Sequence, residues 1–403
     1  MNNKLLMKIF VLLIVLNWSC SNLNENPNDI RIKNELDMIT DNTTVVKISS
    51  CTREEYPLSE IIDSVRYISL ENTDKALIAI IKTIKITNDL IYILDLQSHK
   101  IKCFDRSGTF LRDACQIGAG PQEISHLIDF DVDEDYLYIL DGAKIAIHFF
   151  DHTGKYIKNE KLPYRAHKIH CLPDNCFYFE LAPFGIQNNE NSNLAVYTDS
   201  DFKPIDFLLK YVDGADCGVS FGNQRNSAYL FSSYGNGIYE KVDGKFVMKY
   251  YVDFNGKYFN TNKKDDGFKQ AIEQNVYFTS SAPLHNNTYL LQSYTAGLKR
   301  DGTLLVNLKE NKAMFIRRLI QDKNDLIDFS FSHTMGYDVV NNEFFGICNY
   351  IDLSTIISDK ETAVESIKKY VNKEVQSALI HENEEKDVNQ IIVFYKLKDE
   401  IVF

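Results

Sequence analysis

Leu90–Asp95 reads Leu-Ile-Tyr-Ile-Leu-Asp, and the same pattern returns 46 residues later (136 − 90) as Tyr-Leu-Tyr-Ile-Leu-Asp at Tyr136–Asp141. A second pair, Ile101–Gly108 and Ile147–Gly154, is displaced by the same 46 residues (147 − 101). Repeats of about 40 to 50 residues made of short alternating strands are typical of β-propeller blades. One blade cannot cover its own apolar faces, so the repeat predicts a closed ring of blades.

The number of strands decides the number of blades. Residues 51–403 contain six blade-like units, each with up to four short strands in which apolar and polar residues alternate. Dividing this stretch of 353 residues (403 − 51 + 1) by 46 gives 7.7, but the later units carry long insertions. We therefore expect an all-β, six-bladed β-propeller, with seven blades as the alternative.

The two ends of the domain are expected to share one sheet. The sixth unit is one strand short, and the early strand Val65–Leu70 has no unit of its own. We expect Val65–Leu70 to pair with Ile391–Leu397 and close the ring, which removes open sheet edges. The last unit also contains a predicted helical insertion at residues 358–383, which either packs along the rim or serves as a lid or docking element.

The N-terminus has the features of an export signal. Lys4 and Lys8 give a positive start before the apolar run Ile9–Leu16, which is shorter than the roughly 20 residues that a membrane-spanning helix needs. Ser19 directly before Cys20 resembles a bacterial lipoprotein cleavage site. An ordinary secretory signal is the alternative. Lipidation of Cys20 would hold the folded part at a membrane, facing the periplasm or the cell exterior.

The chain is divided into three expected parts: a signal peptide at residues 1–19, a flexible tether rich in Asn, Asp and Thr at 20–50, and the propeller at 51–403. The formal net charge is −12, and removal of the two lysines in the signal gives −14 (−12 − 2). An acidic surface repels phosphate backbones, so no nucleic-acid partner is expected.

The cysteines indicate neither a zinc site nor another cofactor. The chain has 8 cysteines, which leaves seven apart from Cys20 (8 − 1), and none has zinc-like spacing. Cys171 and Cys176 flank a turn sequence and are expected to face each other across a hairpin. Either a disulfide or two free thiols fits this spacing, and free thiols are favoured.

Two neighbouring motifs carry a family resemblance. Asp105–Phe110 followed by Ile117–Glu123, together with Leu70-Glu71 after the first strand, resembles the signature of the six-bladed β-propeller lipoproteins. This chain has Gln122 where that family usually has Gly. It is similar, more distantly, to NHL-repeat propellers. The resemblance implies an exported, lipid-anchored propeller and no settled activity.

Four side chains are candidates for a binding site at the mouth of the central channel. Glu123 lies in the loop before the second unit, where it would bind its own loop amides or a neighbouring blade. His126 stands just before an inner strand, and Arg165 and His167 open the corresponding strand of the next unit. Because His167 and His170 are three residues apart on a predicted strand, we expect them on opposite faces, unable to chelate one metal.

Other polar residues are interpreted as structural. Acidic residues recur at the strand ends of the repeat and are expected to accept hydrogen bonds from turn amides. They are Asp95, Asp105, Asp141 and Asp151. His148 and His152 straddle a turn and are expected to be exposed.

The function predicted from these features is binding. No motif of a hydrolase or metalloprotease is recognisable, so we expect a binding or scaffold protein for a peptide, glycan or protein partner. The alternative is an NHL-type hydrolase or lyase with its site at the channel mouth. A sensor partner that docks through the predicted helix is a third hypothesis.

Overall fold

The computed structural model describes most of the propeller, namely residues 38–172, 175–181, 193–210, 217–221, 228–232, 235–242, 245–257, 273, 276–279, 283–296, 299–320, 334–338, 340–348 and 389–403. The predicted signal peptide, Cys20 and the helical insertion at residues 358–383 lie outside the described residues.

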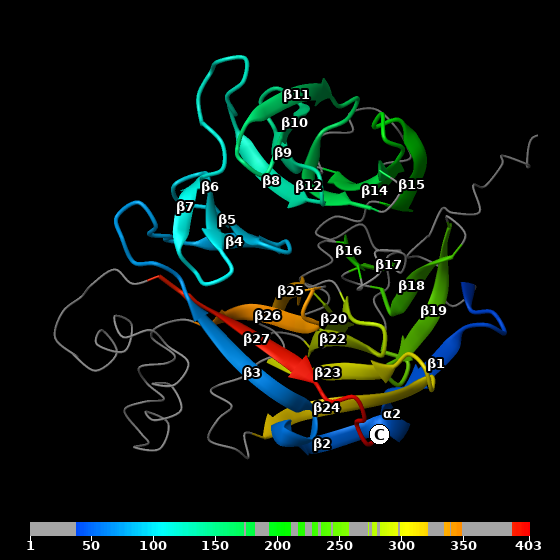
Figure 1. Cartoon of the computed structure of the whole chain (residues 1–403). Coiled ribbons are helices and arrows are strands. Elements are labelled where there is room, and N and C mark those ends of the chain that lie inside the picture. The colour runs from blue at the N-terminus through cyan, green and yellow to red at the C-terminus, as the bar shows by residue number, and fades with distance from the viewer. Residues whose placement is uncertain are drawn as a thin grey trace, which may run out of the picture.

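Six sheets form the ring that Figure 1 shows. The first contains β4 (Ile81–Ile86), β5 (Leu90–Asp95), β6 (Lys100–Asp105) and β7 (Phe110–Asp113). The second contains β8 (Leu127–Val132), β9 (Leu137–Asp141), β10 (Ala146–Phe150) and β11 (Tyr156–Lys161). The third contains β12 (Ala166–Cys171), β13 (Phe177–Leu181), β14 (Asn193–Thr198) and β15 (Pro204–Lys210).

The remaining three sheets include strands from the N-terminal segment. The fourth contains β16 (Cys217–Phe221), β17 (Ala228–Ser232), β18 (Gly237–Val242), β19 (Lys245–Asp253) and β1 (Thr44–Lys47). The fifth contains β20 (Tyr277–Phe278), β21 (Leu284–His285), β22 (Tyr289–Ala296), β23 (Lys299–Asn307), β24 (Lys312–Ile320) and β2 (Thr52–Pro57). The sixth contains β25 (Thr334–Asp338), β26 (Glu343–Cys348), β27 (Ile391–Leu397) and β3 (Ile62–Ser69). The predicted six-bladed propeller is confirmed.

The sixth sheet joins the two ends of the described chain. β27 runs antiparallel to β3, and Val393 is the register partner of Tyr67. The hydrophobic cluster beside this sheet contains Ile68 and Phe394 of the sixth blade and Ile84 of the first. Five further clusters hold residues of the other neighbouring blades. The core is therefore a ring of apolar layers between sheets, as expected when single blades cannot bury their own faces.

The N-terminal segment forms a belt along the outside of the ring. β1 pairs in parallel with β19, and β2 pairs in parallel with β24, so both add an outer strand to a blade. A short helix, α2 (Ile48–Cys51), connects them, and η2 (Leu58–Glu60) leads into β3. Figure 1 shows this belt along the lower rim. Residues 44–50, which we expected to belong to the tether, are thus part of the folded domain, because long-range pairing orders a stretch too short to show periodicity.

The repeated aspartates cap turns, as predicted. Oδ1 of Asp105 accepts hydrogen bonds from the backbone N–H groups of Ser107 and Thr109, each at 2.9 Å. Asp151 makes the equivalent bonds one blade later. Burial raises the pKa of Asp105, but the hydroxyl of Ser107 and these amides outweigh burial and lower it. The hydroxyl of Thr153 and the equivalent amides likewise lower the pKa of Asp151. Gly108 adopts φ +90° in the same turn, where a Cβ would lie 2.2 Å from the backbone oxygen of Ser69.

The two histidines that we expected to be exposed are not. His148 lies within β10, its side chain is fully buried, and its Nε2 is 3.7 Å from Oδ2 of Asp141. His152 is half-buried, and its Nδ1 is 2.9 Å from the hydroxyl of Tyr92. The prediction was wrong because the turn begins only after Phe150, so His148 still points into the layer between blades.

Candidate functional site

A β-bulge recurs at the start of the inner strands β4, β8, β12 and β25. In each, the pairing register shifts around the second residue of the strand. These second residues are Lys82, Ile128, His167 and Met335. A bulge breaks the strict alternation of side chains along a strand. Because the bulge recurs at the same place, residues one and three positions after it are equivalent in successive blades. Their side chains contact one another between neighbouring inner strands.

Asp131, three positions after the bulge of β8, connects three blades. Its Oδ1 is 2.8 Å from Nζ of Lys85, the equivalent residue of the first blade. Its Oδ2 accepts a hydrogen bond of 2.9 Å from the backbone N–H of Cys171 in the third blade. Burial raises the pKa of this carboxyl group, but Lys85 and the amide outweigh burial and hold the pKa below its usual range. Asp131 is therefore a charged structural link.

Asp129, one position after the same bulge, makes the parallel set of contacts without an ion pair. Its Oδ1 accepts a hydrogen bond of 3.2 Å from the hydroxyl of Thr83, and its Oδ2 accepts one of 3.1 Å from the N–H of Ile169. Burial raises the pKa of Asp129, and the more distant Lys85 only partly offsets this effect. The two carboxylates therefore have a structural role, linking the inner strands of neighbouring blades.

Glu180 of β13 gathers three side chains of β12 around one buried carboxylate. Its Oε2 is 3.3 Å from Nε2 of His167 and 2.8 Å from Nζ of Lys168, while its Oε1 is 3.6 Å from Nε2 of His170. Burial raises the pKa of Glu180, but these groups outweigh burial and leave the pKa far below its usual range. Our prediction that the two histidines point to opposite faces was wrong, because His167 is the bulged residue.

His126 lines a pocket of about 270 Å³ between the first and second blades. Its backbone is fixed, since its carbonyl oxygen accepts a bond of 2.9 Å from the N–H of Gly142 and its N–H donates to Oδ1 of Asp141 at 3.2 Å. Its side chain remains exposed. The other lining residues are Lys82, Leu94, Leu96, His99, Leu127 and Ile128. We call this space the His126 pocket, and it combines an apolar wall with basic side chains.

Arg165 occupies the position in the third blade that His126 occupies in the second, directly before the inner strand, and it is exposed. The starts of the inner strands lie at one face of the ring. We call the basic side chains of the first three blades at this face the basic mouth. It consists of Lys82, His126, Arg165, His167 and Lys168.

Glu123 lies in the loop that joins the first and second blades. Its Oε2 accepts a hydrogen bond of 2.7 Å from the N–H of Gly120. Nζ of Lys144 donates to the carbonyl oxygens of Gly120 and Glu123, at 2.9 and 2.6 Å. The expectation that Glu123 binds its own loop is confirmed. Its role toward a ligand remains a prediction.

Within the described ranges, no three His, Cys, Asp or Glu side chains form a group that could hold a metal ion. Cys171 and Cys176 are both free thiols, and the N–H of Leu172 donates to the oxygen of Cys176 at 2.8 Å across the hairpin. Sequence reasoning missed Lys82, Lys168 and Glu180. Lys82 and His167 occupy equivalent positions, each being the second residue of an inner strand. An alignment of the blades by their bulges is the signal that could have identified these basic positions.

A family model described as a domain of unknown function, DUF4934, matches residues 43–396. A protein from Bacteroides fragilis NCTC 9343, which its name gives as a candidate exported protein, has a TM-score of 0.65 and 16% identity, covering 88% of this chain and 100% of that one. A member of the DUF4221 family from Bacteroides vulgatus ATCC 8482 has a TM-score of 0.50 and 9% identity, covering 84% and 97%.

A virginiamycin B lyase from Staphylococcus aureus gives a TM-score of 0.41 at 10% identity, covering 70% of this chain and 81% of that one. No curated protein matches the chain. The predicted resemblance to β-propellers is confirmed at the level of the fold. In the part of the chain that the structure describes, no helix is both long and apolar enough to cross a membrane.

Proposed function

Because this chain belongs to the DUF4934 family, whose description assigns no function, we propose one from the site: an exported, lipid-anchored protein that binds an acidic peptide segment of a partner at the basic mouth. The lipid anchor is the predicted modification of Cys20. The peptide is held by its backbone and side chains, without chemical change.

The charge balance at the basic mouth is the observation that carries this proposal. The nearby carboxylates of Asp129, Asp131 and Glu180 are buried and already contact Lys, His, hydroxyl or amide groups. The side chains of His126 and Arg165 are exposed at the same face. The guanidinium of Arg165 and the imidazole nitrogens of His126 are therefore available to a ligand while the carboxylates are engaged, and this favours an anionic partner.

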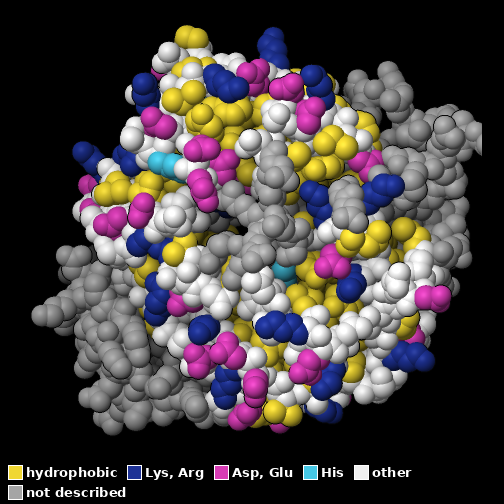
Figure 2. All heavy atoms as spheres, turned by 45° about the vertical axis from the view of Figure 1, so that its right-hand side comes forward, with side chains coloured by type: hydrophobic (Ala, Val, Ile, Leu, Met, Phe, Trp, Pro, Cys, Tyr) yellow, Lys and Arg dark blue, Asp and Glu magenta, His cyan; other side chains and the backbone are white. Residues whose placement is uncertain are grey.

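The His126 pocket supports a peptide rather than a small ion. Leu94, Leu127 and Ile128 give it apolar walls, and Leu96 is 44% exposed at its edge. A pocket of this kind fits one aliphatic side chain of a peptide whose neighbouring carboxylates reach the basic side chains. Figure 2 shows acidic and basic side chains interspersed over the face in view.

The test is fluorescence anisotropy with a labelled, acetylated peptide of alternating Leu and Glu, compared with the same peptide carrying Lys for Glu. We expect the acidic peptide to bind more tightly, with affinity that falls as salt is added. Arg165→Gln and His126→Gln should each weaken binding about threefold or more, as loss of a rim contact of roughly 0.7 kcal/mol predicts.

Lys161→Gln is the matched control, because Lys161 is an exposed residue at the end of β11, on the outer side of the second blade. Equal binding of both peptides, or equal effects of the three substitutions, would contradict the proposal. Measured turnover of the peptide would instead support the NHL-type hydrolase or lyase that the sequence left as the alternative.

A further inference from the structure

A second pocket lies at the opposite face of the ring, between the fifth and sixth blades. Its volume is about 240 Å³. It is lined by the β21–β22 turn, the β23–β24 turn, the β25–β26 turn and the segment after β27. Turns that follow an inner strand lie at the face away from the strand starts, because successive strands of a blade are antiparallel. We call it the asparagine pocket, and its polar residues are Asn286, Asn287, Thr288, Lys309, Asn342 and Asp399.

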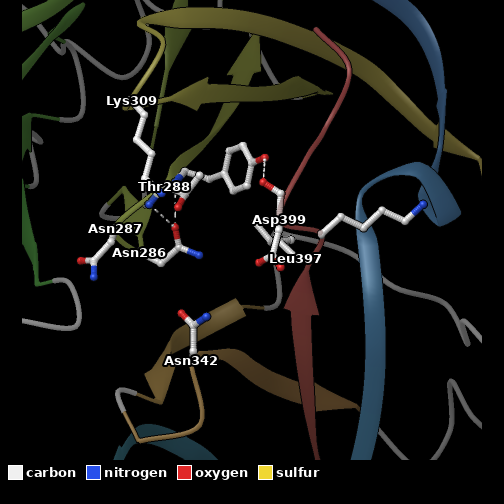
Figure 3. A pocket seen from close by; sticks show the side chains of 9 residues that line it. Asn286, Asn287, Thr288, Lys309, Asn342, Leu397 and Asp399 are labelled. Carbon is white, nitrogen blue, oxygen red and sulfur yellow. Dashed lines mark hydrogen bonds between the residues drawn. The ribbon is translucent and has the colours of Figure 1, made fainter.

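Two amide side chains in this pocket have fixed orientations. Oδ1 of Asn286, a residue only 8% exposed, accepts the backbone N–H groups of Thr288 and Tyr289 at 2.8 and 2.7 Å. Oδ1 of Asn342 accepts a hydrogen bond from the hydroxyl of Tyr337. Each oxygen therefore helps to hold the fold, and the amino group of Asn286 lies on the other side of its amide, away from the turn that its oxygen holds. Figure 3 shows Asn286 and Asn342 on opposite sides of the pocket.

Charges of both signs accompany these amides. Lys309 and Asp399 are exposed, and neither has a side-chain ion-pair partner among the described residues. The backbone oxygen of Asp399 accepts a bond of 3.0 Å from the hydroxyl of Tyr289, which anchors the segment that carries the carboxylate. An anion would meet the carboxylate and a cation would meet the ammonium group. A neutral ligand with several hydroxyl groups avoids both repulsions.

Hydroxyl groups fit this set of partners, because each can donate to the carboxylate and accept from an amide or ammonium group. The pocket volume of about 240 Å³ leaves room for a small ligand such as one sugar ring. We propose that the asparagine pocket binds one neutral sugar unit of a glycan. The proposal does not depend on peptide binding at the basic mouth.

Saturation-transfer NMR with methyl glycosides of glucose, galactose, mannose and N-acetylglucosamine tests this proposal on the folded chain. We expect saturable transfer to at least one of them. Asn286→Asp keeps the oxygen that holds the turn and removes the amino donor, and Asp399→Asn removes the carboxylate. Each should weaken binding about tenfold, as loss of one hydrogen bond to a well-placed hydroxyl predicts.

Glu400→Gln is the matched control, because it removes an exposed carboxylate next to Asp399 that does not line the pocket. Thermal unfolding of each variant verifies folding, and Lys309→Gln replaces any variant that fails. Binding of none of the glycosides would overturn the proposal. Binding that survives both pocket substitutions would overturn it too, as would binding of acetate or methylammonium as tight as that of the glycosides. Loss of peptide binding at the basic mouth would not bear on this outcome.

Discussion

Val393 of β27 lies opposite Tyr67 of β3, so strands from the two ends of the described chain form one antiparallel pair. Ile392 beside it is fully buried in the cluster between the sixth and first blades. We expect Ile392→Ala to lower the free energy of unfolding by about 2–5 kcal/mol, because it leaves a cavity at the junction. Urea unfolding measures this change in the free energy of unfolding. Val402→Ala, at a residue 76% exposed, should change stability by less than about 0.5 kcal/mol.

Lys85→Met should destabilise the ring more than loss of a surface charge would. The substitution leaves Asp131 buried and without its cation, which costs about 3–5 kcal/mol at neutral pH. The double variant Lys85→Met/Asp131→Asn should recover part of this loss, since Asn still accepts the N–H of Cys171. A double-mutant cycle from chemical denaturation gives the coupling free energy, and additive effects of the two substitutions would contradict the ion pair.

Glu180→Gln should reduce stability at pH 7 by about 3 kcal/mol, because the carboxylate contacts two histidines and a lysine. The pKa of Glu180 is lowered in the folded state, so the unfolded chain takes up a proton first as the solution is acidified. The contribution is complete above the usual pKa of about 4.5 and is lost progressively at lower pH. The difference between wild type and variant should therefore shrink below pH 4.5. A constant difference would contradict this assignment.

Protonation of His148 should also lower the free energy of unfolding when the solution is acidified from neutral pH. Burial lowers its pKa from about 6.5, and the Asp141 carboxylate only partly opposes the effect, so the folded state binds the proton less readily than the unfolded state. Stability should fall as the pH drops below 6.5 and be unaffected by this group above it. His148→Leu should flatten this part of the pH profile, measured by thermal unfolding at several pH values. His126→Leu, at an exposed position, serves as the comparison.

Removal of the N-terminal belt should expose strand edges. A chain that begins at residue 58 lacks β1 and β2, so the outer edges of β19 and β24 lose their partners. Unpaired edges template association, and we expect this variant to form dimers or larger species. Light scattering after size-exclusion chromatography measures the mass. A chain that begins at residue 38 should stay monomeric under the same conditions, and a monomeric belt-less chain would contradict the role of the belt.

The repeat between Leu90–Asp95 and Tyr136–Asp141 was enough to predict the propeller. Strand periodicity and the recurring aspartates are local, and a 46-residue period that buries apolar faces only by stacking leaves few other architectures. The turns that Asp105 and Asp151 cap could be predicted for the same reason, since their hydrogen bonds reach only four residues along the chain.

The arrangement of side chains in the site depends on the register between paired strands, which the sequence of one strand does not specify. His167 and His170 meet one carboxylate because the register between β12 and β13 shifts at the bulge, and register belongs to two strands together. The belt likewise exists only because β19 and β24 offer edges to residues 44–57. The sequence by itself determined the blades and their turns, through periodicity and short-range hydrogen bonds. Only the tertiary structure decided which charged side chains meet, because long-range strand register places them.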